Sequence, residues 1–281
     1  MEELTIDDFV EEVMQGRKDL REIAIKLEEG RNHVDVPKLN PQYTTDLDLS
    51  DSHLAGINFK GLDLSGSKFD RSLLIGGSFE DARLEDASFE GAVFSYGTHD
   101  KVNGVTYDPT NFSRARMRRA NLRATFANDV DFSEADLSYA VVGVGSDFSG
   151  EVMDLPDDSR SLYTIGEHKE GGGFHGGAKL RFSDFRGASL RYVDFRGLDM
   201  WKVDLRDADL TGANFYKTTL DGSKLNRGTK IKDTEFRNAL FDLSEFDNVN
   251  FSHGNFRDAY FCEAIFTGHT DFSNADLQNA D

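Results

Sequence analysis

The sequence predicts an all-β solenoid with a short helical cap at its amino terminus, and two observations carry that prediction. From Leu49 to Phe94 a Leu or Phe stands at every fifth residue, ten times without a break. This period fits neither the ~3.6-residue turn of a helix nor the alternation of a strand, so each unit must turn a corner. Second, a small residue such as Ala82 stands two positions before most large ones. Such units bury apolar side chains only by stacking on their neighbours.

Composition excludes several classes of protein. The chain of 281 residues has one cysteine, Cys262, so no intrachain disulfide is possible and a reducing compartment is expected. Its acidic amino terminus does not resemble a signal peptide, and no stretch approaches the ~20 apolar residues of a membrane span. A net charge of -19 disfavours direct binding to nucleic acid or to an anionic membrane. We therefore expect a cytoplasmic protein with a protein partner.

Residues 1–46 are expected to form the amino-terminal cap and a lead-in loop. Thr5 and Asp8 resemble a capping box, and Phe9 and Val13 lie on one side of a helix over residues 5–15. Residues 18–27 fit either a second helix or a first five-residue unit, and the unit is the preferred interpretation. Residues 28–46 hold two of the four prolines and show no period, which indicates a loop.

Residues 47–281 carry the repeat, which two segments interrupt. Residues 95–111 break the count and predict a loop, after which the repeat resumes at Phe112. Residues 143–177 are first acidic and then rich in glycine, which predicts a mobile excursion before the next block.

The large residues of the units are expected to form the core. Representative positions from all blocks are Leu49, Phe69, Phe89, Leu122, Leu190, Phe236 and Phe256. Seven consecutive units from Phe236 to Phe266 all carry Phe, which predicts a ladder of stacked rings.

Several units share the form Ala, Asp or Asn, then Leu, as in Ala120-Asn121-Leu122, Ala135-Asp136-Leu137 and Ala275-Asp276-Leu277. This form resembles the pentapeptide repeat proteins, over about four-fifths of the chain. The resemblance implies a right-handed quadrilateral β-helix in which four units make one coil and residues 20 apart stack on one face. It further implies about nine coils and a rod ~45 Å long.

Acidic residues at outward positions of the first block are candidates for binding a partner: Asp70, Glu80, Asp81, Glu85, Asp86 and Glu90. Acids spaced regularly on a rigid rod imitate DNA phosphates, which the resemblance associates with members that bind DNA gyrase. A basic cluster between Arg114 and Arg123 interrupts this strip. The sequence therefore allows DNA mimicry over part of the rod.

A second candidate surface is a column of basic and aromatic side chains: Arg196, Tyr216, Arg237 and Arg257. Such a column suits carboxylates or phosphates of a partner. Asp184, Asp194 and Asp204 each stand two residues before an arginine, so a lattice of ion pairs is the favoured interpretation of these arginines.

The sequence predicts no catalytic site, cofactor or metal site. His168 and His175 with Glu167 and Glu170 have atypical spacing for zinc. The glycine-rich run lacks the Gly-Lys-Ser/Thr ending of a phosphate loop. We expect a non-catalytic, protein-binding rod.

Two functions stay open for that rod. The first is a DNA-mimicking protein that interacts with DNA gyrase or another topoisomerase and confers resistance to topoisomerase poisons. The alternative is a regulatory or structural scaffold for another protein, as in some cyanobacterial members of the family. The last residues, Asn279 to Asp281, still lie inside the repeat, so we expect a homodimer through the carboxyl-terminal coil or a sequence shorter than the native chain.

Overall fold

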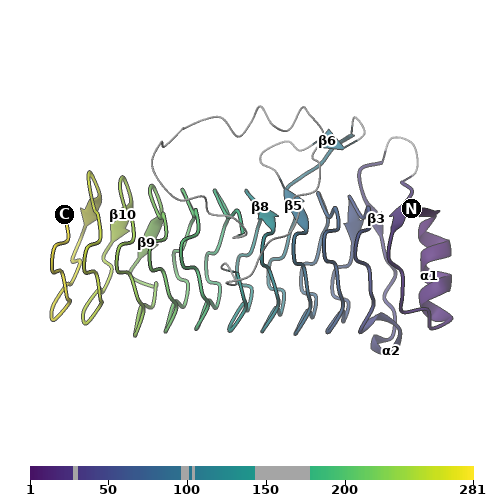
Figure 1. Ribbon diagram of the computed structural model, residues 1–281, viewed down its shortest axis with the longest axis horizontal. Helices are drawn as coiled ribbons and strands as arrows, with labels where there is room; N and C mark the ends of the chain where they lie inside the picture. Colours follow the sequence, from purple (N-terminus) through teal and green to yellow (C-terminus); the bar gives the residue numbers. More distant parts are fainter. Residues whose placement is uncertain (28–30, 96–100, 103–104, 143–177) are drawn as a thin grey trace.

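The protein is a rod of stacked square coils, capped at the amino end by a helix (Figure 1). A computed structural model describes residues 1–27, 31–95, 101–102, 105–142 and 178–281. The coils follow one another in sequence order along the rod, as the colours of Figure 1 show. The predicted right-handed quadrilateral β-helix is confirmed.

Each side of a coil is a very short strand held to the next coil by parallel pairing. The N–H of Leu49 donates to the carbonyl of Lys68, and the N–H of Lys68 donates to the carbonyl of Leu47, each at 2.7 Å. Ten successive parallel bridges run along this side from Asp19 to Asp276. Because every coil pairs with both neighbours, the backbone groups of the interior coils are satisfied.

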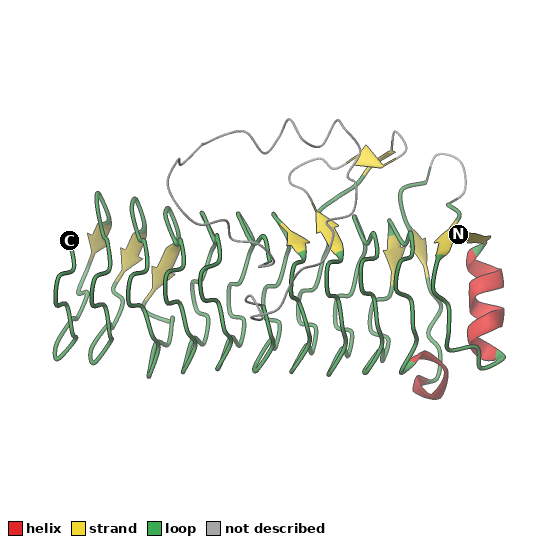
Figure 2. Cartoon of the chain, in the orientation of Figure 1, coloured by secondary structure: helices red, strands yellow, loops and turns green. Residues whose placement is uncertain are grey.

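Regular elements are short, and most of the rod is turns and single bridges (Figure 2). The helices are α1 (Ile6–Met14) and α2 (Pro41–Thr44). The strands are β1 (Glu2–Leu4), β2 (Ile23–Ile25), β3 (Val34–Asp35), β4 (Ile57–Asn58), β5 (Val93–Ser95), β6 (Lys101–Val102), β7 (Val105–Thr106), β8 (Phe126–Ala127), β9 (Lys224–Asn226), β10 (Glu245–Asp247) and β11 (Ile265–Thr267). Within the described residues, neither helix is long and apolar enough to cross a membrane.

The cap is smaller than residues 1–46. Helix α1 begins with the predicted capping box between Thr5 and Asp8, and Phe9 and Val13 are buried. Residues 18–27 already belong to the first coil, because Asp19 pairs with Asp48 and β2 pairs with β1. The rod therefore starts before residue 47.

Residues 28–46 also depart from the expected loop. Strand β3 pairs with β4, and Val36 and Thr44 are buried, so this stretch completes the first coil. Its irregular spacing, with α2 inserted, hides the five-residue period. A count of units from residue 47 therefore omits this coil.

The seven representative core residues are all buried, with at most 2% of each side chain exposed. Rings from successive coils stack, as Phe236 does with Phe215 at 5.2 Å and with Phe256 at 5.0 Å between ring centroids. A neighbouring column includes Phe266, which stacks on Phe246 at 5.0 Å between ring centroids. Aromatic stacking thus runs along the axis of the rod, as the sequence predicts.

The interruption at residues 95–111 leaves the rod after β5 and contains the antiparallel pair β6 and β7. The rod resumes where Ser78 pairs with Asn111. The second predicted excursion, residues 143–177, lies outside the described residues. Across it, the N–H of Ala178 donates to the carbonyl of Val142 at 3.4 Å.

Candidate partner-binding surfaces

The residues before and after each large residue point outward and form four faces. We name each face by the large residue it carries in the coil that starts at Leu49: the Leu49, Leu54, Phe59 and Leu64 faces. Bridges connect the same positions from coil to coil, so Asp48 stacks on Lys68 and Asp63 on Arg83. Surface chemistry can therefore be followed as columns along the rod.

The six candidate acids are spread over three faces and most are paired with bases. Asp70 and Glu90 lie on the Leu49 face, Glu80 and Asp81 on the Phe59 face, and Glu85 and Asp86 on the Leu64 face. They do not share one face.

Arginines of the next coil neutralise several of these acids. The Arg114 Nε donates to Asp81 at 2.8 Å, and this hydrogen bond lowers the pKa of Asp81. Arg119 does the same for Asp86, at 2.6 Å. Glu80 pairs with Lys60 at 2.7 Å, which lowers its pKa, and it also pairs with Arg114. The basic cluster thus binds the acids of the neighbouring coil.

The other acids of this set form ion pairs or hydrogen bonds with neighbouring residues of the rod. Glu85 lies 3.2 Å from the Arg83 Nε. Asp70 accepts a hydrogen bond from the Glu90 N–H at 2.9 Å, and Glu90 accepts one from the Asn121 side chain at 3.0 Å. Most of the six candidate carboxylates therefore have partners within the rod and do not form a row of uncompensated charges like DNA phosphates.

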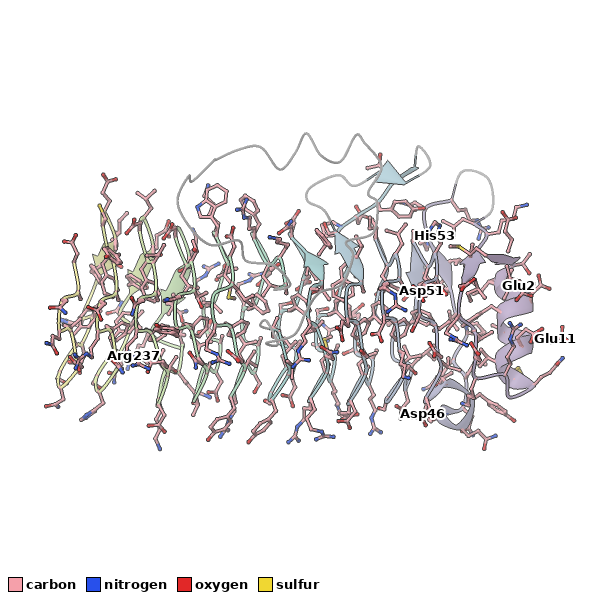
Figure 3. All side chains as sticks on the ribbon, in the orientation of Figure 1. Glu2, Glu11, Asp46, Asp51, His53 and Arg237 are labelled. Carbon is pink, nitrogen blue, oxygen red and sulfur yellow. The ribbon has the colours of Figure 1, made fainter. Side chains whose placement is uncertain are left out.

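The column of Arg196, Tyr216, Arg237 and Arg257 forms on the Leu49 face toward the carboxyl end. The Arg237 guanidinium lies 5.5 Å from the centre of the Tyr216 ring, in cation–π geometry. Figure 3 labels Arg237 near one end of the rod and Asp51 near the other.

Each arginine of this column has a carboxylate. Arg196 donates to Asp194 at 2.8 Å, Arg237 lies 3.0 Å from Glu235, and Arg257 lies 3.6 Å from Asp276. On the Phe59 face, Arg186 and Arg206 likewise pair with Asp184 and Asp204. These are the alternating ion pairs that the sequence favoured.

The Leu54 face is apolar at Leu73, Ile75 and Val93, where the first interruption partly covers it. Tyr107 packs on Ile75 and Val93 in a small cluster outside the main core, with 7% of Tyr107 exposed. This contact holds the segment that carries β6 and β7 against the rod. The sequence analysis did not identify it, because residue 107 lies outside the repeat.

The Leu64 face carries a group that the sequence analysis also missed. Tyr139 and Tyr192 are 50% and 48% exposed, and their rings stack with centroids 5.1 Å apart. Arg118 and Arg191 flank them on the same face. The stacking rule of 20 residues does not relate positions 139 and 192, because residues 143–177 intervene.

Nothing in the described part of the chain resembles a metal centre, since no group of three His, Cys, Asp or Glu side chains is close enough to hold an ion. His168 and His175 with their neighbouring acids lie outside the described residues. Cys262 is exposed.

Several solved structures are similar to the chain. One is HetL, a pentapeptide repeat protein involved in heterocyst differentiation regulation from the cyanobacterium Nostoc sp. strain PCC 7120, with 19% identity and a TM-score of 0.42 over 99% of this chain and 94% of that one. Another is QnrB1, a plasmid-mediated fluoroquinolone resistance protein, with 17% identity and a TM-score of 0.29 over 94% and 90%.

No curated protein matches the sequence significantly. The family of pentapeptide repeats matches in eight copies, over residues 110–141, 176–200, 188–227, 229–268 and 244–281. The earlier blocks continue the same columns of stacked units. The chain belongs to the pentapeptide repeat family.

Proposed function

We propose that the chain is a non-catalytic rod that binds another protein through its outward columns. The observation that carries this proposal is the column of Arg196, Tyr216, Arg237 and Arg257, in which a buried core fixes the spacing of charged and aromatic side chains. Rigid side chains bind at a lower entropic cost than mobile ones. Arginine and tyrosine are also enriched where proteins meet.

Among the possible partners, the geometry favours a protein that is not a topoisomerase, so that the rod acts as a regulatory or structural scaffold. A DNA mimic needs a face of uncompensated acids. Here Asp81 and Asp86 are bound by arginines, and the six candidate acids lie on three faces.

Binding to DNA gyrase or another topoisomerase is the second candidate, and two observations favour it. The net charge of -19 makes the rod a strong anion as a whole. Tyr107 also fixes the segment with β6 and β7 beside the rod, which adds a second surface for a partner. A resistance function through gyrase would use the acidic surface and this segment together.

A DNA gyrase supercoiling assay with added purified chain separates the two candidates. The scaffold proposal predicts unchanged supercoiling and no protection of gyrase from a quinolone. Inhibition or protection would favour the topoisomerase candidate, above all if Asp70→Asn with Glu90→Gln abolished it while Asp258→Asn did not. None of these three substitutions should disrupt the rod, because all three side chains point outward.

We also propose that a second copy covers the exposed apolar carboxyl end. Ile265, Phe266 and Leu277 are 54%, 44% and 42% exposed there. Sedimentation at micromolar concentration should show a dimer, and Phe266→Asp should yield a monomer. A wild-type monomer under these conditions would exclude this assembly.

A further inference from the structure

Two tyrosines on the Leu64 face adopt a backbone conformation that is unfavourable for an aromatic residue. Tyr139 and Tyr192 occupy the corner after their units with φ of 63° and 58°, in the left-handed region. L-residues with bulky side chains rarely adopt this region. On the same corner, other coils carry small residues at Gly66, Gly212 and Asn274 and larger ones at Asp86, Arg119, Asp233 and His253, all with positive φ. The corner therefore accepts many types of residue and gains nothing in backbone energy from tyrosine.

The two rings form one exposed stacked pair, whose edges face solvent. They stack with an angle of 16° between their planes, and about half of each side chain is in contact with solvent. The Tyr192 ring continues over Gly212, where an added Cβ would come within 2.4 Å of the ring. Position 212 thus leaves room for the ring to lie along the rod. Exposed aromatic side chains such as these are favoured contact surfaces in protein interfaces.

Three arginines lie on the same face as the rings, and none of them forms a close ion pair. Arg118 is nearest to Asp136, at 3.9 Å. Arg116 and Arg191 are exposed and form no ion pair within the described ranges of the chain. By contrast, Arg119 in the same unit as Arg118 is bound to Asp86. Counting Asp136 and Asp209, which interacts electrostatically with Arg191, these side chains give a local charge of about +1 on a chain of -19.

A small residue lies between two of these arginines, Arg118 and Arg191. Ser138 lies between the levels of Arg118 and Arg191, is 6% exposed, and its Oγ is 2.8 Å from the Ser189 Oγ. The backbones of Arg118 and Arg191 lie two coil levels apart, a distance of roughly 10 Å. Carboxylates three residues apart on a peptide in the extended polyproline II conformation lie on one side of it, about 9 Å apart. The two guanidiniums therefore match an acidic segment of this conformation laid along the rod.

We propose that the Tyr139 patch, formed by Tyr139, Tyr192, Arg116, Arg118 and Arg191, binds an acidic, aromatic-containing peptide segment of a partner protein. The arginines bind its carboxylates and the exposed edges of the tyrosine pair contact its aromatic side chains. Charge complementarity selects this occupant, because an extended nucleic acid would meet the repulsion of the whole acidic rod. The patch lies on a different face from the column at Arg196, so the proposal is independent of what that column binds.

Fluorescence anisotropy of a labelled 12-residue peptide with glutamate at every third position and tyrosines among the residues between, titrated with the full chain, tests the proposal. Binding should saturate and should weaken as salt is added. Arg118→Gln with Arg191→Gln should weaken it at least tenfold. Arg186→Gln with Arg206→Gln makes the same change in charge on the Phe59 face and should leave it unaffected.

Tyr192→Asn separates binding from folding. Asparagine suits the corner conformation, so the stability of the chain should stay the same or rise, while peptide affinity falls at least fivefold. Absence of peptide binding would overturn the proposal, as would equal losses in the two arginine double variants. Tighter binding of an oligothymidine than of the peptide, lost in the same variants, would instead assign the patch to nucleic acid.

Discussion

The ring of Tyr107 lies against Gly76, where an added Cβ would come within 2.5 Å of the ring carbon Cδ1. Residue 76 is a corner of the rod with φ of 70°, whereas Tyr107 belongs to the first interruption. The absence of a side chain at the corner therefore makes room for the segment that folds back over the Leu54 face.

Gly76→Ala should release this segment. Replacing glycine by alanine at a corner with positive φ lowers the free energy of unfolding by about 1 kcal/mol, and this cost applies equally to Gly76 and Gly61. At Gly61 an added Cβ meets nothing within 4 Å, so Gly61→Ala measures the backbone cost alone. Gly76→Ala should lose a further 1.5 to 3 kcal/mol, roughly the burial energy of the Tyr107 side chain. Chemical denaturation measures both.

Trypsin cleavage after Lys101 gives a second measurement of the same change. It should accelerate in Gly76→Ala and stay unchanged in Gly61→Ala. If the two variants are equally stable and equally resistant, the contact between Tyr107 and Gly76 does not hold the segment.

The regular blocks could be predicted almost entirely from the sequence. Between Leu49 and Phe94 the spacing is unbroken, so the burial of Phe69 and Phe89 follows from the period alone. The first coil could not be counted in this way, because α2 and an irregular turn separate Ile25 from Leu47. Local insertions change the sequence spacing without changing the stacking.

Surface neighbours were harder to predict. The Arg196 column follows from a spacing of about 20 residues, but Tyr139 and Tyr192 meet across an interruption. The pairing of Arg114 with Asp81 was also missed, because the sequence shows a basic cluster after an acidic one and not which coil each reaches. Register across an interruption is set by tertiary packing.

Phe236→Ala should destabilise the rod far more than Phe266→Ala. Phe236 is 1% exposed and stacks on rings from both neighbouring coils, so its loss should cost about 3 to 5 kcal/mol. Phe266 is 44% exposed, and its loss should cost less than about 2 kcal/mol. Urea unfolding followed by circular dichroism measures the difference. Equal costs would mean that the ladder does not continue through residue 236.

Asp51→Asn should reduce stability only where the carboxylate is charged. Arg71 donates hydrogen bonds to Asp51 at 2.7 and 2.6 Å, and they lower the pKa of Asp51 below its ordinary value. The unfolded chain thus binds this proton more tightly, so the stabilisation is complete above an unfolded pKa of about 3.9 and is lost as pH falls through the lower folded value.

Denaturation at pH 7 and at pH 2 measures this effect. Since the pair is partly exposed, Asp51→Asn should cost less than about 1 kcal/mol at pH 7, and its cost should shrink at pH 2. Asp233→Asn is the control, at a corner with φ of 57° and without an ion pair in the described residues. A cost for Asp51→Asn that did not change with pH would exclude the ion pair as its cause.

The Tyr139 patch and the continuity of each face along the rod depend on one claim, that coils on either side of residues 143–177 are direct neighbours. The Oγ atoms of Ser138 and Ser189 lie 2.8 Å apart across that gap. In a Cys262→Ser background, Ser138→Cys with Ser189→Cys should form an intrachain disulfide on mild oxidation, visible as a faster band on a non-reducing gel. Ser138→Cys with Ser252→Cys, at distant coils, should stay reduced. A reduced first pair, or equal cross-linking of both pairs, would contradict the register of the rod and the faces built on it.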